Sequence, residues 1–164
     1  DVLRRRTFGF GSRPPDGASA VYAALLHAHA QAFPGLGLDG SAGDAVAQGY
    51  DATWVAFHAI ALHARSGEPF SGPAVAVFVP QLLPGPGRSQ VAVGPASLAS
   101  SGLAVDLVGA SGPLDFDPAS GVAEQDAEMW IPIADAAGRA SAFAGTGYRY
   151  SAAERRIVGT PVVR

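Results

Sequence analysis

Serine and histidine residues come first among those that could do chemistry, because a hydrolase needs a nucleophile, a base and an oxyanion hole. Ser111 lies in the sequence Gly109-Ala110-Ser111-Gly112, which is one residue off the G-x-S-x-G spacing of a nucleophile elbow. Its glycine and proline neighbours explain a turn without any catalytic role. We therefore interpret Ser111 as a turn residue and predict that the chain is not an enzyme. A serine hydrolase that pairs Ser111 with a histidine is the weakest alternative.

The histidines, at positions 27, 29, 58 and 63, lack the i, i+4 spacing around a glutamate that creates a zinc site on one helix face. We expect ordinary helix residues there, and for His58, beside Trp54 and Phe57, a partly buried and hydrogen-bonded ring. The chain has no cysteine, which excludes disulfides, cysteine-ligated zinc and thiol nucleophiles. The G-T-G sequence at 145–147 lacks the third glycine of a dinucleotide site. No metal and no cofactor is predicted.

Asp115 and Asp117 flank Phe116 and have the separation of a carboxylate pair on a strand. Alternate residues share a face only where the segment is extended, and acid–base catalysis would require raised pKa values. We favour a capping or Asx-turn role for these aspartates before Pro118. Phe116 is expected to pack in the core.

The composition indicates a globular, loop-rich chain of 164 residues, with 48% hydrophobic and only 15% charged residues. The formal net charge is −3, and the basic run at residues 4–6 has no interleaved aromatic residues, so nucleic-acid binding is unsupported. No apolar run approaches the roughly 20 residues that span a bilayer, and no signal-peptide pattern opens the sequence. We expect a soluble chain whose signal peptide lies outside it.

Hydrophobic periodicity predicts the elements that position these residues. The predicted helices cover residues 18–33, 44–64, 73–83 and 95–102, and the first three are opened by Asp16, Asp44 and Ser71. The predicted extended segments cover residues 7–11, 103–107, 128–133, 142–150 and 157–163. The helix over 44–64 is apolar on more than one side and is therefore expected between layers. Pro132 is expected to confine its strand to an edge or a bulge.

Three segments follow one another in a distinctive order. They are the helix over 18–33, the sequence Gly49-Tyr50-Asp51-Ala52 at the opening of the next buried helix, and GASGPLDFD at 109–117 followed by Gly121. The sequence at 49–52 is similar to a G-Y-D-A helix, and the sequence from 109 to 121 is similar to a G-x-[ST]-G-x-[ILV]-x-F-D-x-x-G turn and strand. Together the three segments resemble the type I periplasmic-binding protein family, in particular its branched-chain and amide-type amino-acid receptors, over about residues 8–150.

The resemblance implies an α/β fold with two lobes and helices around a mainly parallel sheet, of which residues 1–164 form the carboxyl-terminal portion. It implies a periplasmic or extracellular solute-binding protein that closes on an amino acid or a similar small polar molecule and serves an ABC transporter permease. The tyrosine of the family's G-Y-D-A motif tends to lie at the cleft, so Tyr50 is the first candidate ligand-binding residue. Asp51 is the other candidate, as an acceptor for an ammonium group. As an early helix residue, Asp51 could equally stabilise the helix dipole.

The family holds the ligand carboxylate with groups of an amino-terminal half that this sequence does not contain. An amino-terminal half on another chain therefore belongs to the expected partners. Residues 81–101 also differ from the short loop that usually joins the motifs. Two alternatives stay open: a sensory or regulatory ligand-binding domain of the same fold, and a truncated fragment without binding activity.

Overall fold

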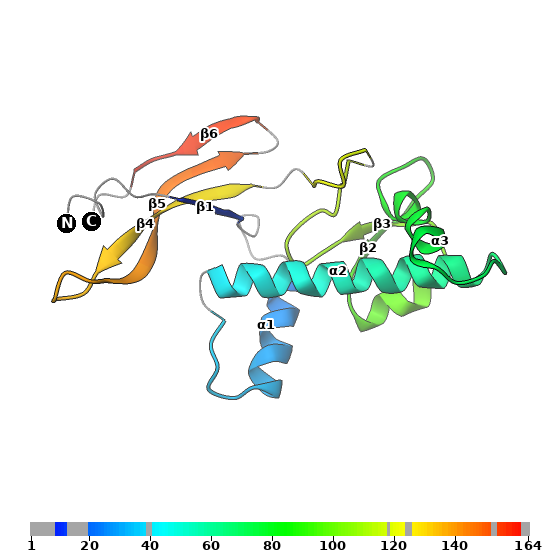
Figure 1. The fold of residues 1–164 in the computed structure, drawn as a ribbon, viewed down its shortest axis with the longest axis horizontal. Coiled ribbons are helices and arrows are strands. Elements are labelled where there is room, and N and C mark those ends of the chain that lie inside the picture. Colours follow the sequence, from blue (N-terminus) through cyan, green and yellow to red (C-terminus); the bar gives the residue numbers. More distant parts are fainter. Residues whose placement is uncertain are drawn as a thin grey trace. The chain divides into compact units, whose positions relative to one another are not determined.

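The computed structural model describes residues 9–12, 20–38, 41–117, 119–123, 126–151 and 154–161, which Figure 1 draws as a coloured ribbon. The internal contacts of the chain divide it into two compact units. Residues 14–124 form one, which we call the helical unit. Residues 1–13 and 125–164 form the other, which we call the sheet unit. Each unit is described by itself.

The described part of the helical unit contains five helical segments. They are α1 Ala20–Ala32, α2 Ser41–Ala64 and α3 Gly72–Ala76, with the 3-10 segments η2 Val79–Leu82 and η3 Pro95–Ser100. The predicted helices over 18–33 and 44–64 are confirmed as α1 and α2, the long cyan helix of Figure 1. Asp44 does not cap α2, because the helix already begins at Ser41. The helix N-cap expected at Asp16 lies outside the described residues, as does the turn around it.

The predicted helix over 73–83 is divided into two short segments. Ser71 caps α3 as expected, since its hydroxyl oxygen accepts a hydrogen bond from the Ala74 N–H at 3.2 Å. Pro80 lies in the first turn of η2, where its missing N–H leaves no helical hydrogen bond unmade. The predicted helix over 95–102 is the 3-10 segment η3.

A small parallel sheet completes the helical unit. β2, Gln90–Ala92, pairs in parallel with β3, Asp106–Val108. The extended segment predicted over 103–107 overlaps β3 but starts too early. The core cluster joins Ala59 and Leu62 of α2 to Leu107 of β3, all of them buried. The buried side of α2 therefore packs in the same core as the sheet.

The opposite side of α2 remains largely uncovered by the described residues. Phe57 is 54% exposed and Ile60 is 38% exposed, although Ala47 and Ala59 on the same helix are only 1% exposed. The expectation that α2 lies between two layers is thus confirmed for one side only. No helix in the described residues combines the length and the apolar character needed to cross a membrane.

The sheet unit is a four-stranded antiparallel sheet in the order β1-β4-β5-β6. Its strands are β1 Gly9–Ser12, β4 Ala127–Ala134, β5 Ala140–Ser151 and β6 Arg156–Gly159. The segments predicted over 128–133 and 142–150 are confirmed as β4 and β5, and the segment predicted over 157–163 overlaps β6, which ends at Gly159. The expectation that Pro132 lies on an edge strand is wrong, because β4 lies between β1 and β5. Its alternative, a bulge, agrees better with the register shift between Ile133 and Ala134, next to the proline. The described residues of β1 pair with residues 127–130.

The fold class is therefore mixed helix and sheet, with a parallel and an antiparallel sheet. The expectation of a mainly parallel sheet is wrong for the described residues, since the parallel sheet has two strands and the antiparallel sheet has four. β4 and β5 pair antiparallel because a tight turn at residues 135–139 joins them, and tight turns join antiparallel strands.

Candidate functional site

The carboxyl ends of the two parallel strands lie at one edge of their sheet, because β2 and β3 run in the same direction. Val93 and Gly94 follow β2, and Gly109 and Ala110 follow β3. The Val93 N–H donates to the Val108 carbonyl at 2.8 Å and extends the ladder to this edge. Such edges are where α/β sheets commonly bind ligands.

Asp51 of α2 reaches the turn that follows β3. Its Oδ1 accepts a hydrogen bond from the Ala110 N–H at 2.7 Å, and its Oδ2 accepts from the Ser111 N–H at 2.7 Å and from the Ser111 hydroxyl at 2.6 Å. The residue is only 2% exposed. Hydrogen bonds to both carboxylate oxygens compensate for the loss of solvation on burial. The carboxylate therefore fixes the turn of residues 109–112 onto α2.

This arrangement was not expected from the sequence for Asp51. Because α2 begins at Ser41, Asp51 lies in the third turn of the helix, where a dipole effect has faded, so the helix-dipole interpretation is wrong. Ser111 lies in a turn, as its glycine and proline neighbours predicted, and its hydroxyl group donates a hydrogen bond to Asp51. A β-carbon on Gly109 would overlap the Asp51 carboxyl group, so only glycine fits beside it.

Tyr50 is half-buried and points to the backbone at Val93 and Gly94 that follows β2, which we call the Gly94 corner. A β-carbon on Gly94 would lie 3.4 Å from the Tyr50 hydroxyl oxygen, which locates this hydroxyl beside the Gly94 backbone. Gly94 has φ 145°, a conformation that favours glycine. The Tyr50 ring meets the Trp54 ring edge to face at 6.1 Å between centroids. The neighbouring residues Tyr50 and Asp51 thus reach the two corners that follow β2 and β3.

A buried serine–histidine pair lies beneath the same edge. His58 Nε2 is 2.9 Å from Ser97 Oγ, and the two residues are 0% and 2% exposed. The Ser97 hydroxyl donates to the Gly94 carbonyl at 2.7 Å. Within the described residues, His58 Nδ1 is buried without a hydrogen-bond partner. Burial lowers the pKa of His58.

The hydrogen bond expected for His58 is confirmed, whereas the expected partial burial is wrong, because the residue is fully buried. Ser97 was missed, because 39 residues separate the two side chains and sequence spacing carries no signal at that range. A buried hydroxyl cannot reach a substrate, so the pair is a structural feature of the core. His63 is also buried, with the rings of Phe70 and Phe78 at 5.8 and 5.9 Å.

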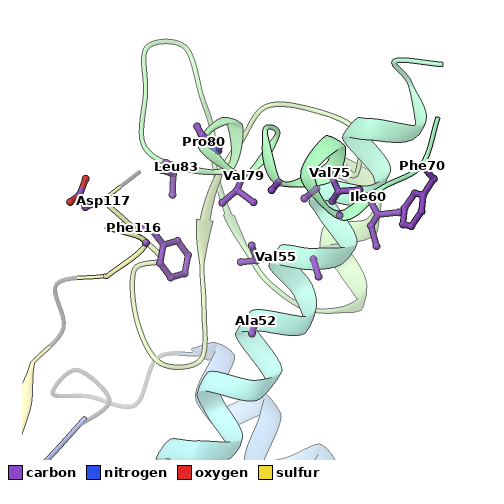
Figure 2. Close-up of a pocket in the computed structure, with 15 residues that line it drawn as sticks. Ala52, Val55, Ile60, Phe70, Val75, Val79, Pro80, Leu83, Phe116 and Asp117 are labelled. Carbon is purple, nitrogen blue, oxygen red and sulfur yellow. The ribbon is translucent and has the colours of Figure 1, made fainter. Parts of the chain in front are cut away.

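An apolar groove of about 610 Å³ lies on another side of α2. Figure 2 shows Ala52, Val55 and Ile60 of α2 on one wall and Val75, Val79 and Phe116 around it. Tyr50 and Asp51 are not among its lining residues. Asp117 at one end is engaged in its own turn, where it accepts from the Ala119 N–H at 3.0 Å and the Ser120 hydroxyl at 2.8 Å. The groove therefore offers mainly apolar contact.

The turn role predicted for Asp117 is confirmed by these hydrogen bonds, which lower the pKa of its carboxyl group. Desolvation, with a smaller contribution from Asp106, raises the pKa of Asp115. The two shifts have separate local causes. Phe116 packs against the core cluster as expected. Among the described residues, no group of three or more histidine, aspartate or glutamate side chains is arranged to hold a metal ion.

The chain was compared with family models, curated proteins and solved structures, and none of them matches it.

Proposed function

We propose that this chain is the carboxyl-terminal part of a type I solute-binding protein that binds an amino acid or a similar small polar molecule and serves an ABC transporter permease. The observation that carries the proposal is the contact between the two motifs of the resemblance. Asp51 of the G-Y-D-A sequence accepts three hydrogen bonds from Ala110 and Ser111 of the G-A-S-G-P-L-D-F-D sequence. Two motifs that belong to one site should meet, and these do.

The position of Tyr50 supports a ligand site at this edge. Its hydroxyl lies beside the Gly94 backbone, at the carboxyl end of a parallel strand. A half-buried tyrosine can pack its ring on an apolar part of a ligand and donate a hydrogen bond to a polar part. We assign Tyr50 the direct contact. Asp51 holds the turn that forms the neighbouring part of the wall, and its other predicted role, an acceptor for an ammonium group, stays a prediction.

The amino-terminal half expected from the resemblance would supply the opposite wall. On this proposal an amino acid bound to the present chain alone touches one wall, and a dissociation constant near 1 mM, about −4.1 kcal/mol, is the expected order of magnitude. The export of the protein to the periplasm or cell exterior is part of the same proposal.

The proposal is tested by titrating the purified chain with single amino acids and recording amide resonances by NMR. We expect one chemical group of amino acids to shift the amides of Gly94 and Ser111, and Tyr50→Phe to weaken this response by removing the hydroxyl. Tyr148→Phe, a similar change in the sheet unit, is the matched control and should leave it unchanged. If no amino acid moves these resonances at millimolar concentration, the proposed site is wrong.

A further inference from the structure

We propose that His58 and Ser97 are positioning residues that hold the Gly94 corner against the Tyr50 hydroxyl. The ligand part of this inference rests on the proposed function, whereas the positioning itself is a property of the helical unit. Two hydrogen bonds connect these residues directly to the corner: His58 Nε2 lies 2.9 Å from Ser97 Oγ, and Ser97 Oγ lies 2.7 Å from the Gly94 carbonyl oxygen.

The direction of these hydrogen bonds follows from the number of protons available. A carbonyl oxygen can only accept, so the single hydroxyl proton of Ser97 is committed to Gly94. His58 must then donate from Nε2–H to Ser97 Oγ, which makes Nδ1 the unprotonated nitrogen of the ring. This agrees with the surroundings of Nδ1, which has no partner among the described residues. A buried N–H without an acceptor would cost more than a bare lone pair.

Ser97 donates two hydrogen bonds to the Gly94 carbonyl, because its backbone N–H also donates to that oxygen, at 2.9 Å. That carbonyl belongs to a residue whose φ of 145° is unusual, and its backbone faces the Tyr50 hydroxyl. Residues in rare backbone conformations persist where neighbours determine them. The buried pair is such a neighbour, because it anchors the corner to the carboxyl-terminal half of α2.

A further line of contact connects the pair to Tyr50 along α2 itself. The Trp54 ring lies 6.1 Å from the Tyr50 ring and 6.5 Å from the His58 ring, and these residues follow at i, i+4 and i+8 on one helix face. Tyr50 is therefore supported from its own helix through Trp54 and faces a corner held by Ser97. Removal of either pair member should move the corner relative to the tyrosine.

The first test follows resonances of the folded chain without any ligand. Long-range proton–nitrogen correlation spectra should show His58 as the Nε2–H tautomer. Ser97→Ala should shift the Gly94 amide and the Tyr50 ring resonances, and Ser100→Ala, on the same 3-10 segment, is the matched control. If Ser97→Ala moves these resonances no more than Ser100→Ala does, or if His58 is the Nδ1–H tautomer, the proposal is wrong.

A conservative pair at position 58 keeps the test decisive should Ser97→Ala unfold. His58→Gln retains an N–H donor and should leave the chemical shifts of the Gly94 amide and the Tyr50 ring unchanged. His58→Leu has no donor and should change them. A merely space-filling role predicts that leucine serves as well as glutamine, and that result would overturn the proposal.

The ligand titration separates this inference from the proposed function. If an amino acid binds, Ser97→Ala should weaken binding about tenfold and Ser100→Ala should not. Binding without any effect of Ser97→Ala overturns the positioning role and leaves the proposed function standing. If Ser97→Ala shifts the resonances as expected but the chain binds no amino acid, the positioning role stands and the proposed function is wrong.

Discussion

The Asp51 carboxyl group is the residue-scale feature on which the candidate site depends. A carboxylate that is 2% exposed needs compensation, and the turn of residues 109–112 supplies it through backbone and side-chain donors. The donors approach closely only because Gly109 has no side chain, as the overlap with a β-carbon shows. Sequence patterns identified the motif, and the resemblance selected Tyr50 and Asp51. The pairing of Asp51 with the turn required the structure.

Gly109→Ala should destabilise the helical unit by about 2–3 kcal/mol, because its methyl group would displace the Asp51 carboxyl group from its donors. Gly49→Ala is the matched control on α2, where a β-carbon would meet no atom within 4 Å. It should stabilise the helix by about 0.5–1 kcal/mol. Urea unfolding followed by Trp54 fluorescence, with Trp130→Phe present in each protein, measures both changes. Equal and small effects of the two substitutions would contradict the described packing.

The stability of the helical unit should decrease on acidification, partly because of His58. Burial lowers its pKa, so the folded state favours the neutral ring more than the unfolded state does, in which the pKa is about 6.5. Above that pH both states hold a neutral ring and the contribution of His58 is intact. Below it the unfolded state takes up a proton first, and the free energy of unfolding falls by at most about 1.4 kcal/mol per pH unit.

Urea midpoints between pH 8 and pH 5 test this pH dependence. His58→Gln lacks the titrating ring and should show a weaker dependence than the unchanged chain below about pH 6.5. Identical slopes for the two proteins would mean that His58 titrates alike in the folded and unfolded states.

At the scale of elements, periodicity was informative where a segment was long. α1, α2, β4 and β5 were predicted because each repeats its pattern over two or more turns or several alternations. β2 has three residues and was missed, since a strand of that length shows no period. The 3-10 segment η3 was predicted as an ordinary helix, because a proline at its start favours any helical turn. The segment η2 was included in the single helix predicted over residues 73–83.

The β4–β5 hairpin depends on one aspartate at its turn. Asp135 Oδ1 accepts from the Ala137 and Arg139 N–H groups, each at 2.9 Å, and these hydrogen bonds contribute to lowering its pKa. Asp135→Ala should therefore lower the urea midpoint reported by Trp130 of β4. The midpoint reported by Trp54 should not change. The reverse is expected for Asp117→Ala, which removes an equivalent turn in the helical unit.

At the scale of the whole molecule, the two units differ in how much they bury. The helical unit has a cluster of buried apolar residues that includes Leu82, Leu107 and Leu114, each at most 2% exposed. In the sheet unit, Ser151 alone is buried among residues 126–141, 143–151 and 154–161. Composition could not reveal this difference, because apolar residues occur throughout the sequence and burial depends on which faces are covered.

The sheet unit should therefore be the less stable of the two. Phe143 is 64% exposed and Ile157 is 60% exposed, so little apolar area leaves water when this sheet forms, and burial is the main source of stability. Each unit carries one tryptophan, Trp54 in the helical unit and Trp130 in the sheet unit. Trp54→Phe and Trp130→Phe thus give two proteins in which fluorescence reports one unit at a time.

Urea unfolding of these two proteins should give a lower midpoint and a shallower slope for Trp130 than for Trp54, since the slope scales with the surface exposed on unfolding. Far-ultraviolet circular dichroism of both proteins controls for effects of the substitutions, and should give the same composite curve for each. Coincident midpoints would contradict the prediction, because they would mean that the sparse burial within the sheet unit does not set its stability.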